Sequence, residues 1–388
     1  MAQTAYNAKV LQLAWLKTSD LATALAITIN EGDLITDAMI TAAIGSITWQ
    51  QFAVNSDITD HTFIVEPLMQ EQFGEFTRDD IPVKGFEKPE GVLSRIHDSS
   101  MSTTHLDLFQ NGFGNKVVNS ENTDSVNGDI NHSVTVTMLG TGLDSGDEGK
   151  FVKIGNQASI LTNVTGSVLT FASKISAKDG DTIEVLDHFD PDVITDESFI
   201  LFVRTARGAR LVSHVRFGIN FETPYGDLLM LKFNYQGDVA LESTLTWDTI
   251  GTVTKEAYSK DMTTTHFKGV SAGSAENRCV GAFVFKMERE MNRLPCQGTE
   301  SLNGNGGTFR EKYSTADIQI TAYATILNTE YEAKTDIQLL AQKLDFAIYA
   351  PAALIASENV NNVNDNVENV VYTIAANTDQ DKKMMFIL

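Results

Sequence analysis

Hydrophobic and polar residues alternate along two long stretches in the middle of the chain, residues 209–223 and 227–243. Because successive side chains of a β-strand point to opposite faces, this alternation predicts two strands, joined by the turn-compatible Pro224-Tyr225-Gly226. One face of the first strand carries Leu211, Ser213, Val215, Phe217, Ile219 and Phe221, and the other carries Val212, His214, Arg216, Gly218 and Asn220. We expect a sheet that is covered on its apolar face and exposed to water on its mixed face.

Shorter runs rich in β-branched and aromatic residues predict further strands along the whole chain. They lie at 47–54, 61–68, 91–103, 282–290, 315–326, 346–351, 369–377 and 384–388. Helices are predicted at 36–45, with Thr36 as the cap, at 105–114, and at 328–345, where apolar residues recur at helical spacing. Polar or Gly-rich composition predicts loops at 70–90, 115–131, 251–278 and 294–308. The pattern indicates a mainly β protein.

A change of composition separates residues 140–192 from the rest of the chain. Between 148 and 187, short β segments are divided by turn signals at Gly155-Asn156, Thr165-Gly166 and Asp179-Gly180. Strands spaced by about 8–12 residues are typical of small β-barrels. We expect four parts: a lead-in (1–90), the first part of a larger β domain (91–139), an inserted β-barrel-like module (140–192) and the remainder of the β domain (193–388).

Composition narrows the class of protein. Of 388 residues, 42% are hydrophobic, which is enough for a sizeable core and excludes wholesale disorder. No apolar run approaches the roughly 18 residues that a membrane-spanning helix needs, and the first twenty residues do not resemble a signal peptide. The two cysteines, Cys279 and Cys296, cannot form a disulfide framework and are expected to be buried free thiols. We expect a soluble protein folded in a reducing cytoplasm.

The chain is strongly acidic. It has 29 Lys and Arg against 51 Asp and Glu, a net charge of −22 at pH 7. Proteins that hold DNA neutralise phosphates with clustered basic residues, whereas the basic residues here are scattered. The acidity is explained either by solubility alone or by a surface that lets a polyanion pass without sticking.

Candidate chemistry is sparse. The seven histidines are dispersed, and the chain contains neither HExxH, nor a GxSxG nucleophile elbow, nor a GxxxxGK[ST] phosphate loop. The tightest pairing, His105 two residues before Asp107, is interpreted as a surface helix start. The acidic residues of segment 179–197 offer oxygen ligands for Ca²⁺, but the EF-hand order of ligands is absent, so we expect a solvated acidic turn. We therefore predict no enzyme, no cofactor and no metal.

The order of these elements resembles that of the tail-tube proteins of tailed bacteriophages. The matching run comprises the hairpin 209–243, the strand 282–290, the Gly-rich loop 294–308, TADIQITAYATI (315–326), the helix at 330–344 and FAIYAP (346–351). The chain then closes with NVVYTIAANTDQDKKMMFIL, and the inserted KFVKIGN, ILTNVTGSVLTF and GDTIEV are similar to an accessory domain of some tube proteins. The resemblance covers residues 90–388 and lies in element order; the first 90 residues depart from it.

The resemblance implies a tail-tube β-sandwich or barrel with one flanking α-helix, plus the small inserted domain. It implies a structural virion protein, made in the host cytoplasm, whose hexameric rings stack head to tail into a hollow channel. Partners would be other copies of the chain and other tail proteins, such as a sheath, terminator or baseplate. DNA would pass through the lumen without specific binding, and no membrane would be involved.

An acidic lumen would repel the phosphate backbone and keep DNA mobile. We expect five carboxylates on wetted strand faces to line the channel: Glu222, Asp227, Glu288, Glu290 and Asp317. The alternative for each one is a strand-end or turn carboxylate that faces solvent outside the tube.

Two other functions remain open at this point. The chain could be a neighbouring tail component, a terminator or baseplate hub on the same fold, which would form single rings rather than long stacks. It could also be a carbohydrate-binding adhesive β-protein, in which residues 140–192 would bind sugars through exposed aromatic side chains.

Overall fold

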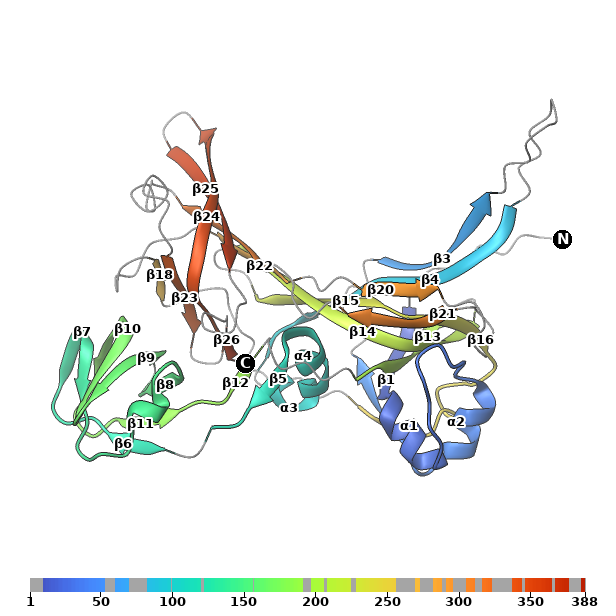
Figure 1. Ribbon diagram of the computed structural model, residues 1–388, viewed down its shortest axis with the longest axis horizontal. Helices are drawn as coiled ribbons and strands as arrows, with labels where there is room; N and C mark the ends of the chain where they lie inside the picture. The colour runs from blue at the N-terminus through green and yellow to red at the C-terminus, as the bar shows by residue number, and fades with distance from the viewer. Residues whose placement is uncertain are drawn as a thin grey trace.

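Strands predominate in the part of the chain that the computed structural model describes, which confirms a mainly β protein. The described residues are 10–52, 60–69, 82–98, 100–119, 122–155, 157–190, 197–205, 208–224, 228–255, 269–272, 282–287, 291–295, 305–310, 316–322, 337–343, 346–364, 367–376 and 385–387. The molecule is elongated, with the inserted module at one end and helices α1 (Thr18–Leu25) and α2 (Asp37–Ala43) near the other (Figure 1).

One long strand, β14 (Gly208–Pro224), crosses the middle of the structure and pairs along both of its edges (Figure 1). Its C-terminal half lies in an antiparallel sheet that we call the amphipathic sheet. In spatial order, the sheet contains β3 (Asp60–Met69), β4 (Pro82–Ile96), β15 (Met230–Gln236), β14, β19 (Ala282–Met287), β22 (Ala316–Ala322), β25 (Val367–Ala376) and β24 (Phe346–Asn364). The predicted hairpin is present, because β14 pairs with β15 from Arg216↔Gln236 to Glu222↔Met230.

The N-terminal half of β14 belongs to a second group of strands. This group contains β13 (Phe199–Thr205), β16 (Val239–Ser243), β1 (Val10–Lys17), β2 (Thr48–Phe52) and β17 (Thr252–Thr254). Helices α1 and α2 pack against it and enclose a core in which Leu21, Ile40, Trp49, Phe202 and Leu211 are buried. As predicted, Thr36 caps α2, its side chain accepting a hydrogen bond from Met39 N at 3.4 Å.

The opposite face of β14 is covered by α4 (Leu106–Phe113), which follows the single turn α3 (Met101–Thr104). Phe109 stacks on Phe113 with ring centroids 6.0 Å apart and contacts Phe233 of β15 at 5.5 Å. These three rings are fully buried. The helix predicted at 105–114 is therefore present and packs on the apolar face of the amphipathic sheet at β14 and β15.

The remaining strands of the C-terminal part extend the sheet beyond β24 or lie beside it. They are β18 (Gly269–Ala272), β23 (Ile337–Lys343) and β26 (Met385–Ile387), with β20 (Met291–Pro295) and β21 (Asn305–Arg310) forming a separate pair. β23 pairs with β24 from Lys343↔Phe346 to Ile337↔Ala353. This finding corrects the predicted helix at 328–345 over residues 337–343, because Ile337, Leu340 and their neighbours pair as a strand.

The inserted module is a closed six-stranded barrel. Its strands, in spatial order, are β6 (Thr123–Ser125), β11 (Thr182–Val185), β8 (Phe151–Ile154), β9 (Gln157–Thr165), β10 (Val168–Ala177) and β7 (Ile130–Thr137), with a 3₁₀ turn at Ser145–Asp147. The last strand meets the first through a bridge at Val126↔Met138 and a hydrogen bond from Leu139 N to Ser125 O at 2.8 Å. Closure leaves neither strand as a free edge, which removes a site for unwanted pairing.

The barrel joins the body through two strands that lie side by side. β5 (Asn115–Val117) enters it and β12 (His188–Asp190) leaves it, and the two pair antiparallel from Val117↔His188 to Asn115↔Asp190. Lys116 forms an ion pair with Asp187 at 2.9 Å, and Asn119 N donates to Asp187 Oδ1 at 3.0 Å. Because the entering strand β5 and the leaving strand β12 pair with each other, the barrel is inserted between two segments of the chain that are adjacent in the rest of the fold.

All four polar segments that the sequence assigned to loops contain strands. β4 begins at Pro82 within 70–90, β6 begins at Thr123 within 115–131, β17 and β18 lie within 251–278, and β21 begins at Asn305 within 294–308. Residues 82–88 of β4 pair with the preceding strand β3 and β21 pairs with β20, whereas β6 pairs with the distant β11. Local composition failed here because the strands are determined by cross-strand pairing, which the residues of one segment do not show.

Candidate functional site

The amphipathic sheet has one apolar and one polar face. In an antiparallel sheet, directly opposed residues share a face. The register therefore assigns each residue to one of the two faces of the sheet. The row through Asn220 contains Lys232, Lys286, Asp317, Ala375 and Leu354. The neighbouring row through Phe221 contains Leu231, Phe285, Ile318, Ile374 and Ile355. The apolar row belongs to the face that α4 covers.

Burial agrees with this assignment along β15 and at residues 354–355 of β24, whereas Ser94 of β4, opposite Lys232 in the polar row, is only 2% exposed. Along β15, Leu231, Phe233 and Tyr235 are buried, whereas the residues between them are only partly buried. At the far end of the sheet, Leu354 on the polar face is 44% exposed and Ile355 on the apolar face is 6% exposed. The predicted arrangement of one covered face and one wetted face therefore holds for these strands.

Two of the five predicted channel-lining residues lie on this polar face. Glu222 is opposite Met230 and Val284, and Asp317 is opposite Lys286 and Ala375. Glu222 and Asn220 are two residues apart in β14, so the rows of Glu222 and Asp317 share one face. The other three predicted residues, Asp227, Glu288 and Glu290, lie outside the described residues, as do Cys279 and Cys296.

The register also places basic residues on this face. Across β15, residues 218–224 of β14, β19, β22 and residues 370–376 of β25, its charged positions are Glu222, Asp317, Lys232 and Lys286. Lys286 is directly opposite Asp317 in the ladder. Across these five strands the polar face thus carries as many basic as acidic positions.

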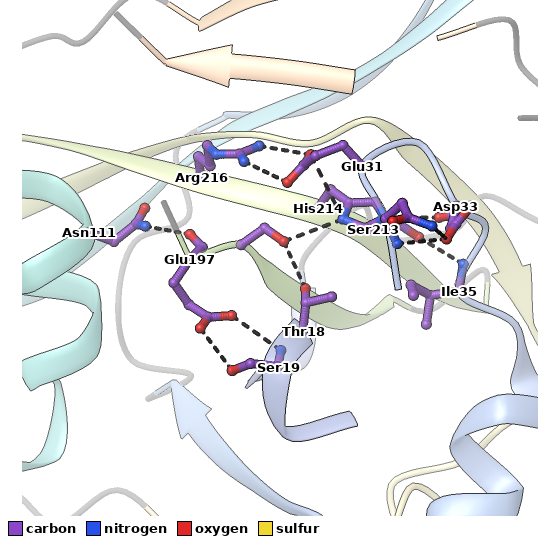
Figure 2. Close-up of polar contacts among 12 residues, drawn as sticks. Thr18, Ser19, Glu31, Asp33, Ile35, Asn111, Glu197, Ser213, His214 and Arg216 are labelled. Atoms are coloured by element: carbon purple, nitrogen blue, oxygen red, sulfur yellow. Dashed lines mark hydrogen bonds and ion pairs between the residues drawn. The ribbon is translucent and has the colours of Figure 1, made fainter. Parts of the chain in front are cut away.

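A buried polar cluster fixes the N-terminal half of β14 (Figure 2). Residues 30–35, which we call the Glu31 loop, lie over the strand. The Arg216 guanidinium, 1% exposed, donates to both carboxylate oxygens of Glu31 at 2.6 and 3.1 Å. His214 Nε2 lies 2.9 Å from the Asp33 carbonyl, and Ile35 N donates to Ser213 Oγ at 3.3 Å. The loop is therefore held to the strand by one ion pair and two hydrogen bonds.

This cluster corrects the predicted two-faced strand over residues 211–219, all of which are buried. His214 has a left-handed φ of 50°, and the single residue Ile200 of β13 faces two residues of β14, since Leu201 pairs with Val212 and Phe199 with Val215. Such a bulge breaks the alternation of faces. Consecutive Ser213 and His214 consequently both contact the Glu31 loop.

The same cluster attaches helices from both sides of β14 (Figure 2). Lys17 at the N-cap of α1 provides no side-chain cap, and instead the Glu197 carboxylate accepts hydrogen bonds from Ser19 N and Ser19 Oγ at 3.2 and 2.8 Å. On the other side, Asn111 of α4 donates to Glu197 O at 2.7 Å and accepts from Phe217 N at 2.8 Å. The polar cluster therefore positions α1 and α4 relative to the sheet.

The contact of Ser198 with His214 has the residue types of a nucleophile and base. Ser198 Oγ lies 3.3 Å from His214 Nδ1, but it donates to Thr18 Oγ1 at 2.9 Å and is only 5% exposed. The other imidazole nitrogen is engaged by the Asp33 carbonyl. A nucleophile needs a free hydroxyl within reach of a substrate, so this geometry serves to hold the fold together.

His105 is not at a surface helix start, as the sequence suggested, but is 1% exposed at the start of α4. Burial, reinforced by the charge of Arg95 and opposed by that of Asp98, lowers the pKa of His105 to about 3. The imidazole is therefore neutral at physiological pH. Asp107, its supposed partner, forms an ion pair with Lys17 at 2.6 Å instead.

Carboxylates of the barrel are used to bind backbone amides at its turns. Asp124 accepts hydrogen bonds from the N–H groups of Ser125, Gly140 and Gly142 at 2.7, 3.0 and 2.8 Å. Asp181, in the segment considered for Ca²⁺, accepts from Lys178 N at 2.8 Å. Within the described residues, no cluster of His, Cys, Asp and Glu side chains could hold a metal ion.

The Asp124→Asn variant is expected to loosen the turn at residues 140–142. Burial alone raises the pKa of Asp124, but its three backbone hydrogen bonds outweigh this effect and lower the pKa below the ordinary 3.8. An amide has one acceptor oxygen where the carboxylate has two, so we expect a loss of about 1 kcal/mol at pH 7 and faster hydrogen exchange at Gly140 and Gly142.

The pH dependence of this difference has a defined sign. A carboxylate whose pKa is lowered by folding stabilises the protein above its unfolded pKa, and this contribution is lost as the pH falls through the folded value. The difference between wild type and Asp124→Asn should therefore shrink below pH 3.8. Hydrogen-exchange mass spectrometry at pH 7 and pH 3 measures it, with Glu184→Gln as a control that leaves Gly140 unchanged.

The barrel lacks the feature on which the carbohydrate-binding alternative depended. The segment of that alternative, residues 140–192, contains neither Trp nor Tyr, and its three phenylalanines, Phe151, Phe171 and Phe189, are 0%, 2% and 3% exposed. Sugar binding commonly uses exposed aromatic faces, which carry an apolar surface suited to stacking. No aromatic platform of this kind exists in the segment.

Comparisons with protein-family models and with curated proteins find no match to this chain. Among the described residues, no helix is both long and apolar enough to cross a membrane.

Proposed function

We propose that the chain is a structural subunit of a bacteriophage tail tube, which forms hexameric rings stacked head to tail around a channel for DNA. The observation that carries this proposal is the amphipathic sheet. α4 covers its apolar face at β14 and β15, and its polar face extends across β15, β14, β19, β22 and β25. A wall between a water-filled lumen and a hydrophobic core needs this arrangement.

The charge pattern of the polar face suits the passage of DNA. Anchoring of a duplex requires clustered basic residues that displace counterions from the phosphates. On this face, Lys286 is opposite Asp317 in the ladder, so a basic position neighbours an acidic one instead of another basic one. We propose that the lumen next to these strands is polar and nearly neutral, with the chain's overall net charge of −22 opposing phosphate binding at longer range.

The proposal includes the partners that such a tube requires. Head-to-tail stacking is a heterologous contact between copies, which generates a filament when it does not close. The ends of the filament would contact other tail proteins, such as a terminator or baseplate, and its outside a sheath where one exists. The chain would be made in the host cytoplasm and function in the virion, as a structural protein without catalytic activity.

Negative-stain electron microscopy of the purified full chain tests this function. We expect hollow rods or stacked rings with sixfold symmetry in end views. Single rings that never stack would instead indicate a terminator or hub on the same fold. A protein that remains monomeric at high concentration and within the particle that contains it contradicts the proposal.

A further inference from the structure

The Asn-Gly dipeptides of α4 and of the barrel lie in opposite surroundings. Asn111-Gly112 is buried in α4, whereas Asn127-Gly128 lies in the connection between β6 and β7, where Asn127 is exposed. We propose that Asn127 is a site of spontaneous deamidation, and that the hydrogen bond between Gly128 and Asp179 limits its rate. This inference does not depend on the proposed function, because it concerns the chemistry of one turn of the barrel.

The reaction needs no reagent other than water. The Gly128 nitrogen bonds to Asn127 Cγ, the bond from Cγ to Nδ2 breaks, and the Gly128 amide proton leaves with the side-chain nitrogen as ammonia. Water then cleaves one of the two ring C–N bonds of the cyclic imide. One cleavage gives aspartate, and the other gives isoaspartate, in which the main chain runs through the former side chain.

The turn at residues 127–128 leaves the attack unobstructed. Gly128 has a left-handed φ of 84°, which favours glycine, so the turn itself requires the residue that makes Asn127 reactive. A Cβ atom added at Gly128 would meet no atom within 4 Å, so the space beside the attacking nitrogen is open. Within the described part of the chain, no hydrogen bond engages the Asn127 side chain, which can therefore turn toward Gly128 N.

One hydrogen bond opposes the reaction. Gly128 N donates to Asp179 Oδ1 at 2.7 Å, which fixes the orientation of the peptide plane. To react, the nitrogen has to rotate toward Asn127 Cγ and give up this proton. Asp179 is exposed and its own N donates to Asp129 Oδ1 at 3.0 Å, so the restraint is a surface contact that opens far more readily than the core.

Asn111 is protected from the same reaction. Its side chain is 2% exposed, its Nδ2 donates to Glu197 O at 2.7 Å, and its Oδ1 accepts from Phe217 N at 2.8 Å. The amide group is thus held at both ends by contacts outside α4. Reaction at Asn111 consequently requires α4 to separate from β14, which is an opening of the core.

Isoaspartate at residue 127 would disturb the closure of the barrel. Asn127 N donates to Thr137 O at 2.9 Å, directly after the bridge Val126↔Met138, and the next amide, Gly128 N, donates to Asp179. Isoaspartate inserts a methylene group into the main chain between these two amides, so both hydrogen bonds cannot persist in their present geometry. We expect modified copies to show faster hydrogen exchange at Gly128.

Peptide mapping by mass spectrometry tests the site, with the full chain incubated at pH 8 in native buffer or in urea. In native buffer we expect deamidation at Asn127, and a rate at Asn111 lower by at least about 100-fold, because the buried site reacts only when the core opens. In urea the two sites should react at similar rates. Hydroxylamine, which cleaves the chain at the cyclic imide, should cut the native protein after residue 127 and not after residue 111.

Variants separate the site from its restraint. Asn127→Gln should abolish the cut, because the longer side chain forms the ring much more slowly. Asp179→Ala should raise the rate at Asn127 by up to about tenfold, the effect of losing one hydrogen bond, whereas Glu184→Ala on the same barrel should leave it unchanged.

Three results would overturn parts of this inference. A native chain that stays unmodified at Asn127 while the chain in urea reacts overturns the site itself. Equal rates at Asn111 and Asn127 in native buffer overturn the protection by burial. A rate at Asn127 that is unchanged or lower in Asp179→Ala overturns the restraint by Asp179.

Discussion

Replacing Glu31 with alanine is expected to lower the free energy of unfolding by about 3 kcal/mol, because it leaves the Arg216 guanidinium buried without its carboxylate. Arg216 is 1% exposed and donates two hydrogen bonds to Glu31, whose side chain is 35% exposed. Removal of one partner of a buried pair costs more than the pair itself contributes, since the remaining charge stays desolvated. Urea unfolding followed by tryptophan fluorescence measures the loss.

A double-mutant cycle identifies the cause of this loss. In an Arg216→Met background the buried guanidinium that Glu31 pairs with is gone, so adding Glu31→Ala should change stability by less than about 1 kcal/mol. The matched control is Glu242→Ala, which removes an exposed carboxylate and should change stability by no more than about 0.5 kcal/mol. If Glu31→Ala behaves like Glu242→Ala, the Glu31 loop does not depend on the ion pair.

Strands of the sheet could be predicted from the sequence where apolar and polar residues alternate along a single strand. The alternation in 227–243 and 315–326 is sustained over several residues, and β15 and β22 lie there. Apolar side chains at every second position have only one face on which to be buried, so the local pattern determines the strand. The same reasoning identified α2, because its Thr36 cap is a local interaction.

The polar cluster could not be predicted because its partners are distant in the sequence. Glu31 and Arg216 are separated by 185 residues, and neither has a neighbour that suggests an ion pair. His214 was placed on a wetted face, since a bulge on β14 is invisible in an alternating pattern. The prediction for 328–345 failed for a related reason. Its apolar residues fit helical spacing, but β24 offered residues 337–343 a strand to pair with.

The assignment of lumen residues was limited in the same way. Acidic residues can be counted in a sequence, but the residue opposite each one depends on register. Lys286 stands opposite Asp317 only because β19 pairs with β22 at that offset. A one-residue shift of this pairing would move every side chain of the strand to the other face. The balance of acidic and basic positions across β15, β14, β19, β22 and β25 is therefore a property of the fold and not of the composition.

The second large effect is expected at Gly112, where α4 approaches β14 most closely. A Cβ atom added at Gly112 would lie 2.3 Å from Ile219 Cγ1 and 2.4 Å from Ile219 Cδ1. Both residues are buried, so the side chain has little room to move. We expect Gly112→Ala to destabilise the protein by about 2 kcal/mol, because overpacking outweighs the gain of about 1 kcal/mol in helix propensity.

Truncation of Ile219 should reverse the sign of this effect. In an Ile219→Ala background the opposing atoms are gone, so Gly112→Ala retains only its favourable helix propensity and should stabilise that background by up to about 1 kcal/mol. Thermal and urea unfolding of the four proteins in the cycle measure both values. A loss of the same size in both backgrounds contradicts the close packing of α4 on β14.

Since α4 covers the apolar face at β14, Gly112→Ala should also reduce the yield of rods seen by microscopy. The double variant Ile219→Ala/Gly112→Ala should restore part of this yield.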